Sequence, residues 1–247
     1  ELRARPAMAA APAPVAAIDG GVASPPAFQV QKLQGDFTTE FVVPGSVDVA
    51  SSGQLVSLTL ETQALPARWL VQAVPAAQPS AWLLAELPRP AGVWPEGPLQ
   101  LLRERQVVGN ATWPGPSAGG AASAAPETLT LPFGRDELLR VQLLPIERKE
   151  GSAGIVGQRA ERQIARAYRV ENAHRQPITL RLLEPLPTAV DERIAIERRL
   201  VPEPTHPRWQ GQSGVAAWEV TLPPGASQRF SADYTVAWPK DLPVRER

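Results

Sequence analysis

Hydrophobic and polar residues alternate along much of this chain of 247 residues. The clearest run is the last one, in which every second residue is hydrophobic: Phe230, Ala232, Tyr234, Val236 and Trp238. Polar residues such as Asp233 stand between them. Because successive side chains of a β-strand point to opposite faces of a sheet, this run predicts a strand with one buried face.

Further strands are predicted wherever the same pattern recurs between turn signals. They cover residues 28–33, 37–43, 56–60, 68–74, 81–87, 97–108 (a hairpin with its tip at 103–105), 128–133, 139–147, 164–171, 178–182, 194–197 and 218–222. A turn is expected at 134–136 and a flexible connection at 149–157. No segment has the period of a helix. The pattern predicts an all-β fold, interpreted as two consecutive antiparallel β-sandwich-like units with essentially no helix.

Three regions are expected along the chain. Residues 1–25 are rich in Ala and Pro and predict a linker or tail, because proline prevents a regular helix. Residues 26–133 then form a first β domain, and residues 134–247 a second, immunoglobulin-like β-sandwich. Residues 114–126 are a low-complexity loop, which inside a compact domain is either mobile or functional. Its lack of aromatic and charged residues favours a mobile loop.

The last two strands of the second region are expected to pair. Pro223-Pro224-Gly225 joins residues 218–222 to the final run and predicts a turn between antiparallel neighbours in one sheet. In this arrangement Tyr234 and Trp238 pack on the inward face that carries Trp218.

The overall composition excludes several classes of function. Lys plus Arg number 25, as do Asp plus Glu, so the net charge is zero and a general polyanion binder is disfavoured. The absence of cysteine excludes disulfides, thiolate metal sites and cysteine nucleophiles within this chain. No apolar run reaches the roughly 18 residues of a membrane-spanning helix. We therefore expect no nucleic-acid partner and no membrane span. No signal-peptide pattern precedes the first strand, and the start at Glu1 indicates a piece of a longer precursor.

Three short motifs could belong to functional sites, but their sequence context favours a structural role for each. Residues 115–119 spell G-x-S-x-G, but a nucleophile elbow needs a preceding strand and a following helix, which the Pro, Gly and Ala flanks do not predict. His174 and His206 lie in predicted turns without a ligand pattern and are expected at the surface. Gly151, Gly154 and Gly157 match no phosphate-binding fingerprint.

Two pairs of neighbouring carboxylates, Asp136-Glu137 and Asp191-Glu192, also lie in predicted turns. Neighbouring side chains point in different directions, so a glycosidase-like pair would require partners distant in sequence. The sequence therefore predicts no catalytic residue, no cofactor and no metal, and we expect a protein that is not an enzyme.

The seven tryptophans are the most informative residues for binding. Four of them fall within strand patterns and are predicted in the core: Trp69, Trp82, Trp218 and Trp238. The other three fall in Pro/Gly-rich loops and are candidate contacts for a ligand or partner: Trp94, Trp113 and Trp209. An exposed loop tryptophan can stack on a sugar or anchor a protein. The alternative is that these rings fold back as lids over the sheet ends.

A series of short sequence phrases follows a fixed order along the chain: Val43-Pro44 to Leu60, Ala64 to Ala67, Val74-Pro75, Ala81 to Ala85, Pro98 to Gly109, Leu131 to Asp136, Tyr168 to Asn172, Leu183 to Pro187, Trp218 to Gly225 and Tyr234 to Asp241. By these phrases the chain resembles, from about Phe28 to Val244, the C-terminal domain, itself of unknown function, of mucoidy inhibitor A-like proteins. The resemblance implies an N-terminal domain and a coiled coil upstream, a periplasmic or cell-envelope location, and a link to exopolysaccharide phenotypes without an established reaction.

Three functions remain open at this point. The first is a non-enzymatic β-domain of a cell-envelope protein, used for protein–protein interaction, self-association or assembly. The second is a carbohydrate-binding module that contacts envelope polysaccharide through Trp94, Trp113 and Trp209, which requires at least two of these rings to be exposed on one face. The third is a hydrolase whose residues are scattered along the sequence.

Overall fold

In the computed structural model, residues 31–34, 39–42, 51, 53, 59, 61–90, 94, 96–114, 128–145, 147–153 and 159–242 are described. The chain divides into two compact units, Glu1–Gln63 and Ala64–Arg247. The described part of the first unit is an antiparallel pair formed by β1 (Gln31–Gln34) and β2 (Thr39–Val42).

The second unit contains two five-stranded sheets and a separate hairpin. One sheet, here called the upper sheet, has the order β13-β11-β3-β4-β7. Its strands are β3 (Arg68–Ala73), β4 (Ala81–Pro88), β7 (Thr128–Asp136), β11 (Ile178–Pro185) and β13 (Val215–Leu222). The other, the lower sheet, has the order β12-β14-β10-β8, with β9 also paired to β10. Its strands are β8 (Leu139–Leu143), β9 (Glu147–Ala153), β10 (Arg159–Asn172), β12 (Ala195–Val201) and β14 (Ser227–Pro239).

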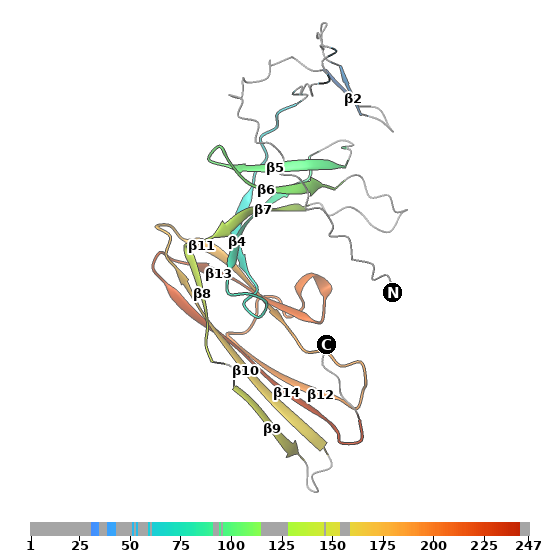
Figure 1. Cartoon of the computed structure of the whole chain (residues 1–247), viewed down its shortest axis with the longest axis vertical. Helices are drawn as coiled ribbons and strands as arrows, with labels where there is room; N and C mark the ends of the chain where they lie inside the picture. The colour runs from blue at the N-terminus through green and yellow to red at the C-terminus, as the bar shows by residue number, and fades with distance from the viewer. Residues whose placement is uncertain are drawn as a thin grey trace, which may run out of the picture. The chain divides into compact units, whose positions relative to one another are not determined.

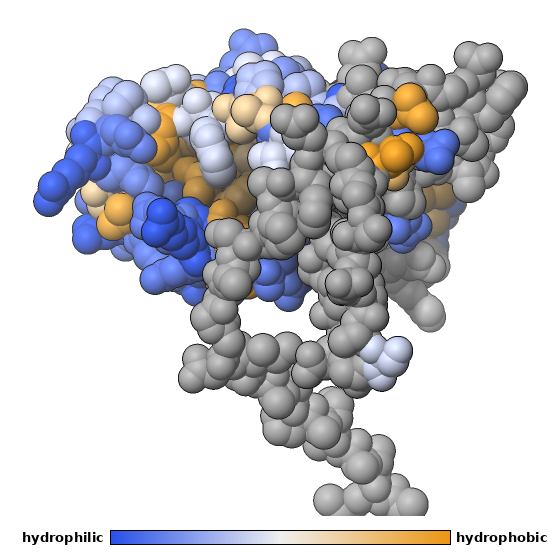
Figure 2. All heavy atoms as spheres, turned by 90° about the horizontal axis from the view of Figure 1, so that it is seen from above, coloured by the Kyte–Doolittle hydropathy of each residue, from blue (hydrophilic) through white to orange (hydrophobic). Residues whose placement is uncertain are grey.

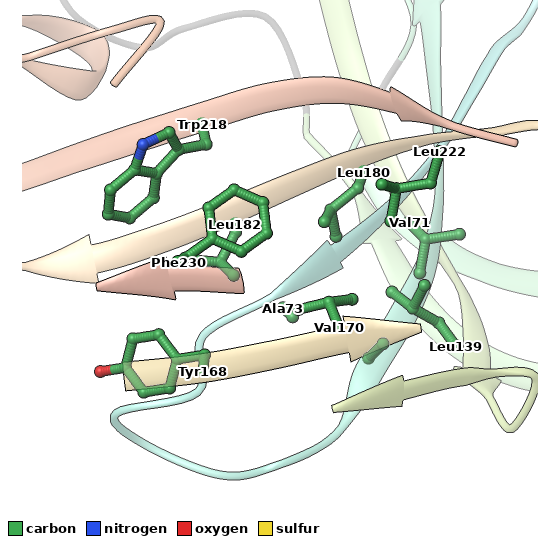
Figure 3. Close-up of a cluster of buried hydrophobic side chains, with 11 residues drawn as sticks. Val71, Ala73, Leu139, Tyr168, Val170, Leu180, Leu182, Trp218, Leu222 and Phe230 are labelled. Atoms are coloured by element: carbon green, nitrogen blue, oxygen red, sulfur yellow. The ribbon is translucent and has the colours of Figure 1, made fainter. Parts of the chain in front are cut away.

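The core lies between the inner faces of these two sheets. In Figure 3, side chains of β13, β11 and β3 point towards those of β14, β10 and β8. Trp218 and Phe230, from opposite sheets, are fully buried with their ring centroids 5.3 Å apart. The indole Nε1 of Trp218 donates to the Pro202 carbonyl at 2.7 Å, so its polar atom is satisfied inside the core. The result is a β-sandwich closed by aromatic and aliphatic packing.

The longest pairing in the protein is that of β10 with β14, which runs from Arg159↔Pro239 to Glu171↔Ser227. In Figure 1 this pair continues downward past the strands of the upper sheet. A second buried cluster, built on Ala216, Ala232 and Tyr234, extends the core along it. Farther out, Val236 and Trp238 are only half-buried.

The remaining strands of the second unit, β5 (Gly97–Arg103) and β6 (Gln106–Trp113), form the hairpin predicted at 97–108. Its two-residue turn, Glu104-Arg105, has positive φ at both positions, 53° and 68°. Two left-handed residues in succession define the turn that matches the twist of a hairpin.

The all-β prediction is confirmed. Within the described strands every pair is antiparallel except β3 with β11, which is parallel. Among the described residues the only helix is a three-residue 3-10 turn, η1 (Trp209–Gly211). None of the helical structure in the described residues has the length and apolar character needed to cross a membrane.

The predicted boundary between residues 133 and 134 is wrong. It falls inside β7, and the upper sheet takes strands from both sides of it. The division lies instead between Gln63 and Ala64. The physical reason is that β3 pairs with β11, more than a hundred residues later in the chain, and sequence patterns do not reveal such long-range pairing.

Several local expectations also differ from the structure. The turn expected at 134–136 is part of β7, where Gly134 adopts φ +88° and lets the strand continue. The connection expected at 149–157 includes most of β9. The predicted linker at 1–25, the loop at 114–126 after its first residue, and the strand at 56–60 apart from Thr59 lie outside the described residues.

The two last strands do not pair with each other. β13 belongs to the upper sheet and β14 to the lower one, so the predicted pairing is wrong. Trp218 nevertheless packs against the apolar side of β14, because the two strands face each other across the sandwich. The apolar alternation fixes which side of a strand is buried, but a strand in either sheet satisfies it.

We predict that Phe230→Ala lowers the free energy of unfolding by about 3–5 kcal/mol, the usual cost of removing a fully buried phenylalanine. Asp233→Ala, three residues away on the opposite face of β14, should change it by about 1 kcal/mol or less. Chemical denaturation of both variants measures the difference. Equal effects would show that the buried face of β14 is wrongly assigned.

Candidate functional site

A cavity of about 520 Å³ opens in the second unit near the end of the sandwich where three turns meet. Its floor is formed by β3 and β4, and its walls come from the β5–β6, β7–β8 and β10–β11 turns. Lining residues include Trp69, Arg103, Glu104, Arg135, Leu138 and His174. Segments distant in sequence therefore supply one concave surface, which is where ligands bind most often.

Trp69 is the largest side chain in this cavity and is 49% exposed. It shares the inner face of β3 with Val71 and Ala73, which are buried in the core. Its ring meets that of Phe133 edge-on, with the centroids 5.0 Å apart. The Phe133 contact thus holds Trp69 in place on the part of the inner face of the upper sheet that lies beyond the buried core.

His174 and Asp136 form a hydrogen-bonded pair on the cavity wall, although 38 positions separate them. His174 Nε2 lies 2.9 Å from Asp136 Oδ2, and Asp136 is 8% exposed. The other oxygen of Asp136 accepts the backbone N–H groups of Leu138 and Leu139 at 2.9 and 3.1 Å. The pair therefore ties the β10–β11 turn to the β7–β8 turn.

Asn172 supports the same region from below. Its side-chain amide donates to the carbonyls of Gln176, Leu222 and Pro223 at 2.9–3.1 Å, and its Oδ1 accepts the His174 backbone N–H at 2.9 Å. Asn172 is fully buried. A buried amide with all these partners fixes the backbone that carries His174.

The outer face of the upper sheet carries a different cluster, a network of four charged side chains from four adjacent strands. Arg181 is 4% exposed and donates to Glu86 at 2.6 Å and to Glu219 at 2.8 and 3.0 Å. Arg68 pairs with the same two carboxylates. The ring of Trp209 covers the Arg181 guanidinium at 4.4 Å, a cation–π contact. Trp209 therefore acts as a lid over this network.

The charges in the network stabilise one another. Partial burial acts to raise the pKa of Glu219, but hydrogen bonds from Arg68 and Arg181 outweigh it and the pKa is lowered. The hydrogen bond to Glu219 in turn raises the pKa of Arg68. Both arginines donate to both carboxylates, so the cluster joins four adjacent strands, which is a structural role.

A third polar cluster is buried between the sheets. Glu184, with no exposed surface, accepts the hydroxyl groups of Tyr168 and Tyr234, each at 2.7 Å. Arg166 completes it with an ion pair at 3.2 Å. Burial, followed by the charge of Glu184 and the hydrogen bond to it, raises the pKa of both tyrosines. Glu184 belongs to β11, so the cluster links the two sheets inside the core.

A wider hollow of about 660 Å³ lies at the far end of the lower sheet, next to Arg159, Arg193 and Lys240. Its arginines are already engaged: Arg193 pairs with Asp191 at 2.7 Å, and Arg159 donates to the Arg193 carbonyl at 2.8 Å. We therefore place the candidate site at the Trp69 cavity, where an aromatic face is available.

Trp94, Trp113 and Trp209 are each half-buried, and none of them is exposed. The prediction that Trp113 lies in a loop is wrong, because Trp113 is the last residue of β6. Trp113 lies beneath Arg89, whose guanidinium carbon is 5.9 Å from the ring centre. Trp209 covers Arg181, as described above, and Trp94 belongs to a different segment before β5. The condition of two exposed loop tryptophans on one face is not met. That they contact a ligand or partner stays a prediction.

The strand tryptophans divide into two groups. Trp218 is fully buried as predicted, and Trp238 is half-buried, with Arg162 stacked on its ring at 5.8 Å. The core prediction is wrong for Trp69 and Trp82, which are 49% and 42% exposed. Alternation places them on strand faces correctly but does not reveal whether another layer covers that part of the face.

The other sequence motifs are distributed as follows. His206 is exposed as predicted and stacks edge-on against Trp209 at 5.4 Å, whereas His174 is drawn into the wall of the cavity. Asp191 pairs with Arg193 at the surface. The G-x-S-x-G segment at 115–119 and two of the three spaced glycines lie outside the described residues. Among the described residues, no group of three or more His, Cys, Asp or Glu is arranged to hold a metal ion.

Sequence reasoning did not identify the Trp69 cavity. Its main residues, Trp69, Asp136 and His174, come from distant positions and were interpreted one at a time as core, turn and surface. The only local signal was the concentration of polar residues in the turns at 103–105, 134–138 and 172–177, and polar turns are common in any β protein.

The buried tyrosines lead to a prediction about alkaline pH. Because their pKa is raised in the folded protein, they contribute stability that is complete below about pH 10, the ordinary tyrosine pKa, and is lost as the pH rises further. The chain has only two tyrosines, Tyr168 and Tyr234. Tyrosinate absorbance should therefore stay low in the folded protein above that pH and rise in one step with unfolding. Gradual ionisation of a protein that remains folded would contradict the buried cluster.

One comparison with known proteins identifies a family. A family model described as a domain of unknown function, DUF4139, matches residues 4–240. No curated protein and no solved structure matches the chain. Since the matched segment covers nearly the whole sequence, the chain belongs to the family of the domain of unknown function DUF4139.

Proposed function

We propose that this chain is a non-enzymatic module of a bacterial cell-envelope protein that binds a protein partner or a second copy of itself through the β5–β6 hairpin. The observation that carries the proposal is an exposed apolar pair near the hairpin tip. Leu102 and Val107 lie opposite each other in the register and are 51% and 55% exposed. Adjacent large apolar side chains in solvent are typical of interaction surfaces.

The form of the hairpin supports this proposal. It is a separate two-stranded sheet, and such a sheet is marginally stable without packing. Leu101 is 4% exposed, so the hairpin is packed at the position next to Leu102, while Leu102 and Val107 remain in solvent. A partner that covered this pair would remove apolar surface from water at little conformational cost.

The tip itself has one further feature of a recognition element. Arg103, Glu104 and Arg105 lie between Leu102 and Val107 in the chain and carry both signs of charge, as do residues in the polar rim of a protein interface.

In the proposed non-enzymatic module the His174–Asp136 pair has a structural use. Both carboxylate oxygens of Asp136 are engaged, one by backbone amides and the other by the imidazole. A carboxylate fixed in this way joins two turns, which explains its burial without a reaction.

The envelope location rests on the resemblance to the C-terminal domain of mucoidy inhibitor A-like proteins. In that context an upstream coiled coil would present the domain to partners, which agrees with an assembly role. The alternative of polysaccharide binding through Trp94, Trp113 and Trp209 is not favoured, because all three rings are half-buried.

We predict that a photo-crosslinking residue at position 102 of the full-length protein forms a defined protein adduct in the native bacterium. The same residue at position 190 is the control, because Val190 is fully exposed but stands alone in a loop. Val107→Asp should abolish the adduct from position 102 without changing the melting temperature, since Val107 is more than half exposed. Equal adducts from positions 102 and 190, or no effect of Val107→Asp, would contradict the proposal.

A further inference from the structure

Trp69 provides an aromatic platform that the core does not use. Half of its surface is in solvent, and the edge-on contact with Phe133 fixes the ring instead of letting it collapse into the cavity. Leu83 and Ile178 line the cavity and are themselves partly buried against the core, so the floor next to the ring is rigid. The face of an aromatic ring carries the negative part of its quadrupole and attracts the weakly positive C–H groups of a sugar ring.

The rim above this platform presents both hydrogen-bond donors and acceptors. Arg103 and Gln176 supply donors, and Glu104 and Thr179 supply acceptors. His174 also lines the cavity, with its Nε2 2.9 Å from Asp136 Oδ2. Sugar hydroxyl groups both donate and accept, so a mixed rim of this kind suits them.

The charges of the rim indicate that the ligand is neutral. Arg135 pairs with Glu137 at 3.2 Å, and His174 with Asp136 at 2.9 Å. Together with Glu104, the cavity holds three carboxylates against the two arginines Arg103 and Arg135. Such a rim provides no excess of positive charge for a polyanion and repels acidic sugars.

The size of the cavity agrees with a small ligand. Its volume of about 520 Å³ lies within the range of roughly 300–1,000 Å³ that small-molecule sites occupy. On the face seen in Figure 2, orange hydrophobic side chains lie between blue hydrophilic ones on the left.

From these observations we infer that the Trp69 cavity binds a neutral oligosaccharide, with one sugar ring stacked on Trp69 and its hydroxyl groups bonded to the rim. This is a second function, which shares Arg103 and Glu104 of the hairpin tip with the proposed protein contact but does not use Leu102 or Val107. It differs from the carbohydrate hypothesis drawn from the loop tryptophans, because those three residues take no part in it.

The test uses the full 247-residue chain and a panel of neutral oligosaccharides of glucose, galactose, mannose and N-acetylglucosamine, with polygalacturonate as the acidic probe. Titration calorimetry should detect binding of at least one neutral member and none of polygalacturonate. Trp69→Ala should weaken this binding about tenfold, the loss expected for one aromatic stacking contact. Trp69→Phe, which keeps an aromatic face, should retain most of the affinity.

Trp82→Ala is the matched control. Trp82 is exposed to a similar degree, 42%, but it lies on the opposite face of the same sheet, so its replacement should leave binding unchanged. Melting temperatures of all variants show that each is folded.

Four results would overturn the inference: no binding of any neutral member, binding of polygalacturonate alone, equal losses in Trp69→Ala and Trp82→Ala, or loss of binding in Trp69→Phe equal to that in Trp69→Ala. Loss of the protein adduct at position 102 in Trp69→Ala, without any sugar binding, would assign the cavity to the protein partner instead. Failure of the adduct experiment alone leaves the oligosaccharide site standing, because the two tests use different residues and different probes.

Discussion

The contact of the two sheets across Trp218 and Phe230 is the interaction on which the rest of the second unit depends. The two rings come from opposite layers and exclude water from the space between them. Around them the inner faces of β3, β11 and β13 meet those of β8, β10 and β14. The inner side of each of these strands is apolar, and none of the strands could bury it without the opposite layer.

The same core contains the carboxyl group of Glu184, and the position of this group is informative. Glu184 replaces an apolar residue on the inner face of β11 and is accommodated because two tyrosine hydroxyls and one arginine surround it. A buried carboxylate without such partners would be strongly destabilising. The cluster joins β11 to β10 and β14 directionally, whereas apolar packing alone permits sliding.

The candidate binding site exists because the lower sheet covers only part of the inner face of the upper sheet. Val71 and Ala73 are covered, but Trp69, on the same face of β3, lies beyond the cover and remains half exposed. The turns that close this end then surround the ring and are tied together by Asp136, His174 and Asn172. Because the lower sheet does not extend over Trp69, a cavity with an aromatic floor forms there. The exposed tip of the β5–β6 hairpin lies next to it.

The sequence by itself determined the class of the fold, most strand positions and the buried side of strands such as β14, because alternation with period two depends only on local geometry. It also located the β5–β6 hairpin. Only the tertiary structure decided that β13 and β14 lie in different sheets, that β3 joins β11, and that Trp69 is exposed while Trp218 is buried. Both tryptophans occupy the same kind of position in the pattern. What separates them is whether a second sheet covers that position, and this depends on pairings between residues far apart in the chain.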